Sequence, residues 1–316
     1  MPASIERIRA HSLFVLGVQK AGTTSLHTLL AQHPSIAAAN PKEPNHYIKI
    51  AATGPMILAT GPAEMAALPY FHDDDYRRAF SVENDHTQFY LDSSTGYLPY
   101  DEALDTIAQR CTSPRVIVVL RDPVSRAYSA YNWARKMGWE PLDTFEAALE
   151  AEDARRAAGY WFSYWYRHHS LYAARIKAVT SRFPFSKFIL FDDLKSRPGE
   201  ICQDIFAWLG LPPVEVTKTQ ANRSGLDRGF MRQQLRKAIG TRRSEQGKLA
   251  GMIRAALPAR LLSGAKRQIT DRLDAELVPP APLAADLKAS LACGFEEEIG
   301  ATETMLGRDL SAWRQP

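Results

Sequence analysis

The sequence predicts an α/β protein with three layers, in which a mainly parallel central sheet lies between helices. Residues 13–18 form a short apolar run that is typical of a buried strand, and Leu26, Leu29 and Leu30 follow at helical spacing. Residues 115–120 are β-branched and almost wholly apolar, which indicates a central strand covered on both faces. The 316 residues are enough for one large α/β domain with insertions.

The remaining elements follow from local signals. Pro123 favours the first turn of a helix, Asp143 and Glu146 have the spacing of a capping box, and Gly210 is typical of a helix end. In chain order we expect a strand at 36–39, a strand from 89 that ends in a hydroxyl-rich turn by 98, and a helix at 102–110, then a helix from 123, a helix from 143 to about 158, a strand at 188–191 and a helix at 198–211.

Charge is unevenly distributed along the chain. Residues 218–272 carry fourteen Lys or Arg and three acidic residues, whereas the rest has twenty-five basic and thirty-two acidic residues. Spaced leucines and isoleucines predict amphipathic helices there, so we expect residues 218–275 to form a basic helical lid or insertion. With a last helix at 283–313, the whole chain, residues 1–316, is predicted to be a single domain with an α-helical basic C-terminal segment.

Solvated helix faces are the commonest meaning of such a charge run, and two functional interpretations stand beside it. The basic segment could close over an anionic cofactor, or it could contact an anionic membrane surface or a lipid-linked substrate. Nucleic acid is not expected as a partner, because the aromatic residues lie elsewhere in the chain. The sequence contains no signal for the oligomeric state.

The compartment is predicted from what the sequence lacks. It has no run of about 18 apolar residues, and its N-terminus has no signal-peptide core. Cys111, Cys202 and Cys293 lie far apart without metal-ligand spacing. We therefore expect a cytoplasmic protein with free thiols and no metal site.

The first candidate site is the turn Gln19-Lys20-Ala21-Gly22-Thr23-Thr24-Ser25 between the first strand and the first helix. Backbone N–H groups and the positive end of the helix dipole make such a turn an anion site. Lys20 adds a full charge, and the three hydroxyls add donors. The alternative is an ordinary turn whose hydroxyls cap the helix.

The turn is close to a nucleotide P-loop but differs in one respect. In the pattern G-x-x-x-x-G-K-[ST] the lysine follows the second glycine directly. Here Gly17 and Gly22 have the right separation, but Thr23 follows Gly22 and Lys20 lies inside the loop. The predicted fold is therefore P-loop-like, with a lysine that approaches the anion from another side.

A carboxylate and an imidazole follow the second predicted strand. Glu43 and His46 lie in a polar, proline-broken stretch at the same edge of the sheet as the Lys20 turn. They are candidates for acid/base work, and the alternative is that both side chains are simply solvated in a loop.

A second anion site is predicted where the strand at 115–120 ends. Arg121 follows this strand, and Arg126 and Ser129 share one face of the next helix. Together they could hold a second phosphate. Two alternatives are a structural pair of an arginine with Asp122, and a magnesium site on Asp122.

Residues 159–172 are dense in aromatic side chains and include His168 and His169. Some of these aromatics belong to the core, and others are suited to stacking on an adenine or a sugar face.

Taken together, these motifs resemble sulfotransferases that use 3′-phosphoadenosine-5′-phosphosulfate (PAPS), in a bacterial branch similar to the heparan-type carbohydrate sulfotransferase domain. The resemblance rests on Gly17–Leu26, Lys42-Glu43, Leu120–Ser129, Phe191–Leu194 and the closing Leu306–Trp313, and covers nearly the whole chain. It implies transfer of a sulfuryl group from PAPS to a hydroxyl of a carbohydrate, glycolipid or secondary-metabolite acceptor, with 3′-phosphoadenosine 5′-phosphate (PAP) released.

The resemblance also implies roles for individual residues. Lys20, Ala21, Gly22, Thr23, Thr24 and Ser25 would hold the 5′-phosphosulfate, and Arg121, Ser129 and, as a weaker candidate, Arg126 the 3′-phosphate. Glu43 matches the carboxylate that deprotonates the acceptor, with His46 as the competing base. No metal is expected, since the sulfuryl group carries less negative charge than a γ-phosphoryl group. The competing hypotheses are a P-loop nucleotide kinase or ATPase and a non-catalytic binder of anionic surfaces.

Overall fold

The computed structural model describes residues 3–51, 56–58, 61–63, 72–217 and 280–315. Its centre is a five-stranded sheet in the order β2-β5-β1-β6-β7, and every neighbouring pair in that sheet is parallel. The strands are β1 (Ser12–Gly17), β2 (Ile36–Ala38), β5 (Phe89–Asp92), β6 (Arg115–Leu120) and β7 (Ser186–Leu190). This arrangement confirms the predicted parallel sheet.

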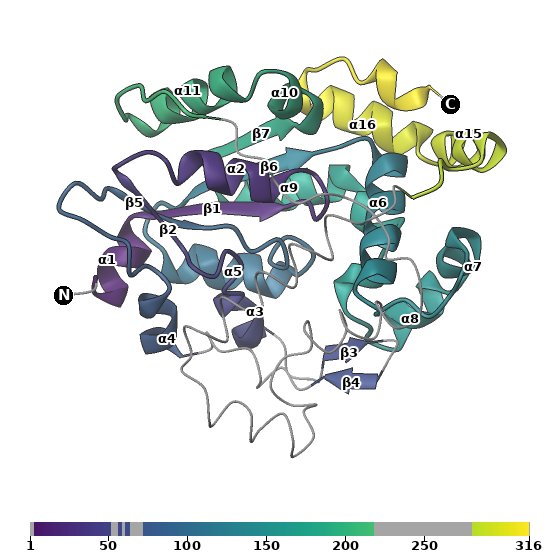
Figure 1. Ribbon diagram of the computed structural model, residues 1–316, viewed down its shortest axis with the longest axis horizontal. Helices are drawn as coiled ribbons and strands as arrows, with labels where there is room; N and C mark the ends of the chain where they lie inside the picture. Colours follow the sequence, from purple (N-terminus) through teal and green to yellow (C-terminus); the bar gives the residue numbers. More distant parts are fainter. Residues whose placement is uncertain (1–2, 52–55, 59–60, 64–71, 218–279, 316) are drawn as a thin grey trace.

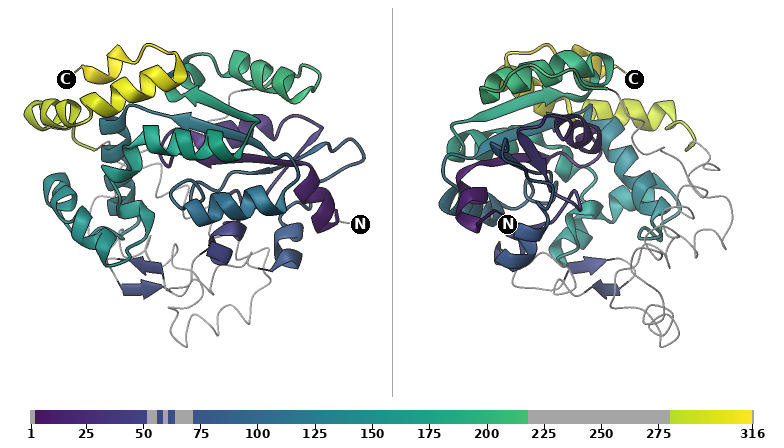
Figure 2. Two further views of the ribbon diagram at one scale, coloured as in Figure 1. Left: turned by 180° about the vertical axis from the view of Figure 1, so that it is seen from behind. Right: turned by 60° about the vertical axis from the view of Figure 1, so that its left-hand side comes forward.

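Helices cover both faces of the sheet, as predicted for three layers (Figures 1 and 2). The helix α2 (Thr23–Leu30) lies on one face, and α5 (Asp101–Arg110) and α9 (Tyr172–Arg182) lie on the other. The other helices are α1 (Ile5–Ala10), α3 (His46–Ala51), α4 (Asp73–Arg78), α6 (Pro123–Lys136), α7 (Phe145–Glu150), α8 (Glu152–Ala157), α10 (Phe191–Ser196), α11 (Pro198–Leu209), α15 (Ala285–Gly294) and α16 (Glu296–Leu306), with the short 3₁₀ turns η2 (Phe162–Tyr164), η3 (His168–Ser170) and η5 (Ser311–Arg314). A separate two-stranded hairpin is formed by β3 (Met56–Leu58) and β4 (Gly61–Ala63).

The core is built on β1 and β6, the two strands with the strongest apolar runs. All six residues of β1 are buried, and so are five of the six in β6. Because these strands are covered on both faces, alternation of polar and apolar residues is absent from them. Their carboxyl ends lie side by side, since Val15 is paired with Ile117 and Gly17 with Val118. The loops that follow β1 and β6 therefore emerge at the same edge.

The helix predicted from Asp143 to Ala158 is corrected in two respects. Thr144 is the N-cap, with its hydroxyl accepting the N–H of Ala147, while Asp143 is paired with Arg135 instead. The chain also turns at Ala151, so that α7 and α8 are separate. Glu152 begins the second helix and accepts hydrogen bonds from two backbone N–H groups of residues 159–172. These bonds tie the start of α8 to that aromatic segment.

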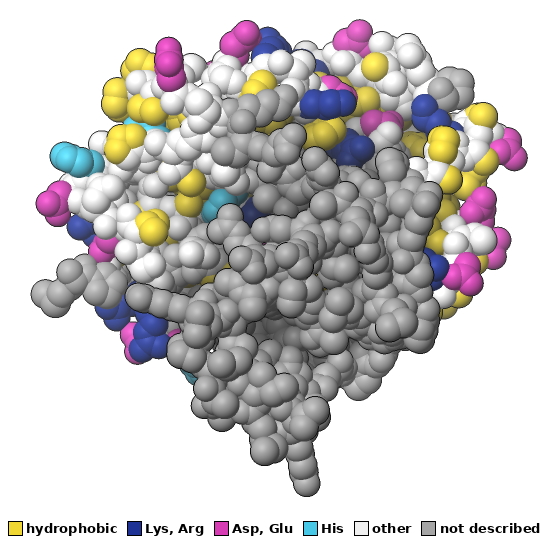
Figure 3. Space-filling view, in the orientation of Figure 1, with side chains coloured by type: hydrophobic (Ala, Val, Ile, Leu, Met, Phe, Trp, Pro, Cys, Tyr) yellow, Lys and Arg dark blue, Asp and Glu magenta, His cyan; other side chains and the backbone are white. Residues whose placement is uncertain are grey.

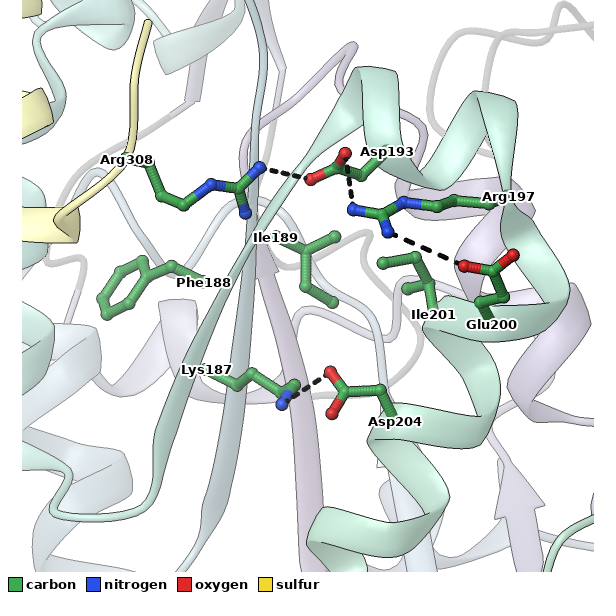
Figure 4. A pocket seen from close by; sticks show the side chains of 9 residues that line it. All are labelled: Lys187, Phe188, Ile189, Asp193, Arg197, Glu200, Ile201, Asp204 and Arg308. Atoms are coloured by element: carbon green, nitrogen blue, oxygen red, sulfur yellow. Dashed lines mark hydrogen bonds and ion pairs between the residues drawn. The ribbon is translucent and has the colours of Figure 1, made fainter.

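The last helix, predicted at 283–313, is divided into α15 and α16 at the buried Phe295. Asp193 of α10 holds the end of this segment through Arg308 and also pairs with Arg197 (Figure 4). The basic segment predicted at 218–275 lies outside the described residues. Over the described part of the face in Figure 3, acidic and basic side chains are interspersed.

Within the described residues, no helix combines the length and the apolar character needed to cross a lipid bilayer. Cys111 and Cys202 are buried and Cys293 is exposed, and none of the three forms a disulfide.

A buried ion pair joins α8 to the loop after α6. Arg155 donates two hydrogen bonds to Glu140, at 2.6 and 2.9 Å, and Glu140 also accepts from Tyr166. Arg155→Met would leave this carboxylate buried without its cation, so we expect the free energy of unfolding to fall by about 3 kcal/mol. Urea denaturation measures it.

The matched control is Arg182→Met, which removes an arginine from a pair with the exposed Asp105. Solvent screens that pair, so the loss is expected to stay below about 1 kcal/mol. Equal losses of unfolding free energy in Arg155→Met and Arg182→Met would show that burial does not make the Arg155–Glu140 pair more important for stability than an exposed pair.

Candidate functional site

The turn between β1 and α2 presents a helix N-terminus that no side chain caps. Gly22 is the N-cap, with φ 84°, and the cap makes no side-chain hydrogen bond. The hydroxyls of Thr23, Thr24 and Ser25 belong to the first turn of α2 instead. The alternative of a turn capped by a hydroxyl at the N-cap is therefore not what the structure has, and the anion site stays a prediction.

Glycine is required at position 22 for two reasons. Its φ lies in the left-handed region, which other residues adopt at a cost. A Cβ placed there would also lie 2.9 Å from the ring of Phe191, at the start of α10. The turn therefore packs closely against Phe191, which directly follows β7.

Arg121 supports the turn from the neighbouring strand end. Its Nη1 donates to the carbonyl of Lys20 at 2.8 Å, and its guanidinium lies 4.7 Å from the centre of the Phe191 ring. Lys20 has φ 72°, a left-handed conformation that costs a non-glycine residue about 1–3 kcal/mol. The hydrogen bond from Arg121 helps to hold this conformation.

The Lys20 ammonium is partly removed from water and surrounded by cations. Burial, together with the charges of Arg121 and Lys136, lowers its pKa to about 8, whereas Glu43 opposes the shift. Its Nζ lies 5.8 Å from the centre of the Trp133 ring on α6. An anion bound here would relieve repulsion among these cations, so the turn is electrostatically prepared for one.

The second predicted loop meets this turn through Lys42. Its Nζ lies 2.7 Å from the Glu43 carboxylate, 3.4 Å from the Thr23 hydroxyl and 3.2 Å from the Ser93 carbonyl. One ammonium thus joins the start of α2, the end of β5 and the candidate base. The predicted placement of Glu43 at the same edge as the Lys20 turn is consistent with these contacts.

The hydroxyl-rich turn after β5 reaches the same place. The Thr95 hydroxyl lies 3.4 and 3.5 Å from the two oxygens of Glu43. Nearby, His27 of α2 contacts the Ser93 hydroxyl at 2.9 Å through Nδ1. Burial and the charge of Lys42 lower the pKa of His27 to about 4, so this ring is neutral near pH 7.

His46 faces a different environment from Glu43. The side chain of His46 is 1% exposed, against 38% for Glu43. Its ring is stacked on Tyr76 at 4.3 Å, and its Nε2 lies 3.3 Å from Asp73. The structure thus places His46 in the interior between α3 and α4, whereas the Glu43 side chain remains accessible to solvent.

Of the three residues predicted for the second anion site, Arg126 is engaged in the interior of the protein. Arg126 is buried and donates to the Ser170 hydroxyl at 2.6 Å and to the Tyr166 carbonyl. It shares a buried stripe of α6 with Ala130 and Ala134, so its side chain is turned inward. Ser129 is half-buried on α6, one turn before Trp133, which faces Lys20. Arg121 and Ser129 therefore remain as candidates at this site.

A model of the sulfotransferase family matches residues 12–215, a span that contains the Lys20 turn, Glu43 and Arg121. The chain belongs to the sulfotransferase family.

Its sequence identity to individual relatives is low but extends over about two thirds of the chain. It is 25% identical over 225 residues to the human bifunctional heparan sulfate N-deacetylase/N-sulfotransferase 3. This match covers 65% of this chain and 23% of that protein. It is 24% identical over 214 residues to the mouse heparan sulfate glucosamine 3-O-sulfotransferase 3A1, covering 65% of this chain and 47% of the relative. The chain thus spans about a quarter of the first of these relatives and about half of the second.

A solved structure has the same fold. The sulfotransferase from Alicyclobacillus acidocaldarius superposes with a TM-score of 0.70 at 23% identity, covering 96% of this chain and 98% of that one. This likeness shows that the two proteins share a fold.

Sequence reasoning missed four side chains of the site. Trp133, Lys136 and His27 were not predicted to take part in it, and Lys42 was noted only as part of the Lys42-Glu43 motif, without a role of its own. Trp133 lies four residues after Ser129 and Lys136 three residues further on, so helical spacing from Ser129 was an available signal. The contact between His27 and Ser93 joins α2 to a turn sixty-six residues away and had no local signal.

Asp122, the residue of the magnesium alternative, has a structural role at the start of α6. This carboxylate is the N-cap of α6 and accepts the N–H of Ser125 at 2.6 Å. Among the described residues, no group of three or more His, Cys, Asp or Glu side chains is arranged to hold a metal ion.

The aromatic segment contributes mainly to the core. Phe162, Tyr164, Tyr166 and Tyr172 are buried, while Trp161 and Trp165 are half-buried. His169 is also buried, and burial lowers its pKa well below the usual range. The half-buried aromatic side chains of this segment are thus Tyr160, Trp161, Trp165 and His168.

A pocket of about 330 Å³ lies along β7 and α11 (Figure 4). Its charged side chains are paired with one another, as in Lys187 with Asp204 and Arg308 with Asp193. Nothing in this pocket points to a ligand.

The pKa of Lys20 predicts how anion affinity depends on pH. PAP is the probe, because it is the nucleotide that the family resemblance implies. A bound anion favours the charged lysine, so above about pH 8 the free protein must take up a proton on binding. We expect PAP affinity to be flat between pH 7 and 8 and to fall by up to about tenfold per pH unit above it. Calorimetric titration measures this slope.

Lys20→Arg is the control, because an arginine stays charged throughout this range. Its affinity is expected to change little between pH 8 and 9.5. The same slope in both proteins would show that Lys20 does not titrate in contact with the anion.

Proposed function

We propose that this chain transfers the sulfuryl group of PAPS to a hydroxyl of a carbohydrate, glycolipid or secondary-metabolite acceptor, with PAP released. The observation that carries the proposal is the bridge made by Lys42. Its ammonium lies 3.4 Å from the Thr23 hydroxyl at the anion-binding turn and 2.7 Å from Glu43. A site for a charged donor and an exposed base are thereby held next to each other, as an in-line transfer requires.

The residues of the turn fit the donor. The uncapped N-terminus of α2, the partly desolvated Lys20 and the close packing at Gly22 form a cationic cradle. We propose that Lys20, Ala21, Gly22, Thr23, Thr24 and Ser25 bind the 5′-phosphosulfate and that Arg121 and Ser129 bind the 3′-phosphate. Arg126 is left out because its guanidinium is buried against Ser170 and Tyr166.

Lys20 and the first N–H groups of α2 would stabilise negative charge on the oxygen that PAP retains. This is electrostatic stabilisation by preorganised donors, which need little rearrangement during the reaction. The Lys42 ammonium lies between the Lys20 turn and Glu43, so it would also stabilise negative charge that develops there. PAPS supplies the activated sulfuryl group, and the protein supplies position and charge.

Glu43 would accept the proton of the acceptor hydroxyl. Its side chain is exposed, and Thr95 and Lys42 hold the carboxylate on the side of the Lys20 turn. His46 lacks this access because it is buried against Tyr76. We therefore choose Glu43 over His46 as the base.

The acceptor is proposed only as a class, a hydroxyl-bearing carbohydrate, glycolipid or secondary metabolite. The similarity to heparan sulfate sulfotransferases favours the carbohydrate member of this class. Those proteins are described by their names as acting on heparan sulfate, and the chain spans only part of each.

The function is tested by incubating the protein with sulfur-labelled PAPS and a panel of hydroxylated acceptors. We expect label to pass to at least one acceptor and Glu43→Gln to lower turnover by roughly 10²–10⁴-fold, since the glutamine cannot take the proton. PAP affinity should change little, because Glu43 lies on the acceptor side.

The matched variant is His46→Phe, which keeps an aromatic ring against Tyr76. Its turnover is expected to stay near that of the unaltered protein. Loss of transfer in His46→Phe with full transfer in Glu43→Gln would reverse the assignment of the base.

A further inference from the structure

Asp92 lies at the end of β5 and is the centre of a buried hydrogen-bond network. Its side chain is 1% exposed and accepts four hydrogen bonds. One carboxylate oxygen accepts the N–H and the hydroxyl of Ser94, at 3.0 and 2.6 Å. The other accepts the hydroxyls of Tyr97, at 2.8 Å, and Tyr76, at 3.1 Å. The proposed reaction uses none of these groups directly.

Two of these hydroxyls also hold the chain that carries Glu43. The Ser94 hydroxyl accepts the N–H of Asn45 at 3.0 Å, and the Tyr97 hydroxyl accepts the N–H of Tyr47 at 3.4 Å. A hydroxyl has one proton and two lone pairs. Because both protons are given to Asp92, the lone pairs of both oxygens are turned toward these two N–H groups.

The segment held in this way is strained and close to the base. Asn45 has φ 54°, in the left-handed region, and its Nδ2 donates to the Glu43 carbonyl at 3.2 Å. A backbone in this conformation persists only where its surroundings hold it. The two N–H groups are fixed points at Asn45 and Tyr47, two and four residues after Glu43.

We propose that Asp92 is a positioning residue for Glu43, acting through the hydroxyls of Ser94 and Tyr97 on the backbone at Asn45 and Tyr47. The inference rests on the proposed function for the role of Glu43. The order of the hydrogen bonds themselves does not depend on that role.

A carboxylate is suited to this task in a way that an amide is not. It only accepts, so it compels both hydroxyls to donate to it, and hydrogen bonds to a charged acceptor are stronger than neutral ones. Burial raises the pKa of Asp92 to about 6, against the effect of its four hydrogen bonds, so the group is ionised at neutral pH. An asparagine would donate from its nitrogen and reverse the direction of some of these bonds.

Tyr76 offers a matched control within the same network. Its hydroxyl donates to the same oxygen of Asp92 as that of Tyr97. In the described structure, no hydrogen bond joins the Tyr76 hydroxyl to the backbone of residues 43–47. Tyr76→Phe and Tyr97→Phe therefore remove the same bond to Asp92, but only Tyr97→Phe also removes the link to Tyr47.

The test compares Ser94→Ala, Tyr97→Phe and Tyr76→Phe in the full chain by three measurements. These are amide hydrogen exchange of residues 43–47, turnover with labelled PAPS, and PAP affinity. For Ser94→Ala and Tyr97→Phe we expect exchange at Asn45 or Tyr47 to quicken and turnover to fall, each by about tenfold or more, with PAP affinity within about threefold. Tyr76→Phe should keep exchange and turnover within about threefold of the unaltered protein, even if its melting temperature falls as far as that of Tyr97→Phe.

Asp92→Asn should loosen both amides and lower turnover at least as much as either single variant. If it does not fold, the three hydroxyl variants still decide the question. The proposal is overturned if Ser94→Ala and Tyr97→Phe leave the two amides protected, or if Tyr76→Phe loses as much turnover as Tyr97→Phe. A protein that neither binds PAP nor transfers sulfate would refute the proposed function, while the exchange measurement would still decide the role of Asp92.

Discussion

The site depends on one electrostatic constraint, which is that several cations are held close together around the start of α2. Lys20, Arg121, Lys136 and Lys42 all act on the same space, and burial makes their mutual repulsion stronger than it would be in water. Such an arrangement is costly in the absence of an anion. The hydrogen bond from Arg121 to the Lys20 carbonyl and the packing of Gly22 on Phe191 hold the turn in place despite this cost. We propose that a bound, multiply charged anion would offset this cost.

The parallel sheet explains why these groups meet. β1, β5 and β6 are neighbours, so the loops after them emerge at one edge, and the segment after β2 joins them from the next position. Each loop contributes a different chemical type: a lysine and backbone donors from the first, a carboxylate from the second, hydroxyls from the third and an arginine from the fourth. Ligands of open α/β sheets bind at this edge for the same topological reason.

The sequence predicted the parts of the structure that rest on local signals. The strands at 13–18 and 115–120, the helix that begins at Pro123 and the turn at Lys20 all follow from apolar runs, proline and glycine. The inward orientation of Arg126 could not be predicted, because it depends on Ser170 and Tyr166, some forty residues away. The same holds for His46, whose spacing from Glu43 suggested a shared site although α4 supplies its partners. Distant contacts decide whether a charged side chain serves a site or the core.

The central claim is that Lys20 and Arg121 hold the two charged ends of one nucleotide. The most direct test is a calorimetric comparison of PAP with adenosine 5′-phosphate, which lacks the 3′-phosphate, in the unaltered protein and in Arg121→Ala. The account predicts that the unaltered protein prefers PAP by about tenfold or more and that Arg121→Ala loses this preference, since a charged hydrogen bond disappears with the arginine. Equal affinity for the two nucleotides in the unaltered protein, or a preference for PAP that survives in Arg121→Ala, would contradict it.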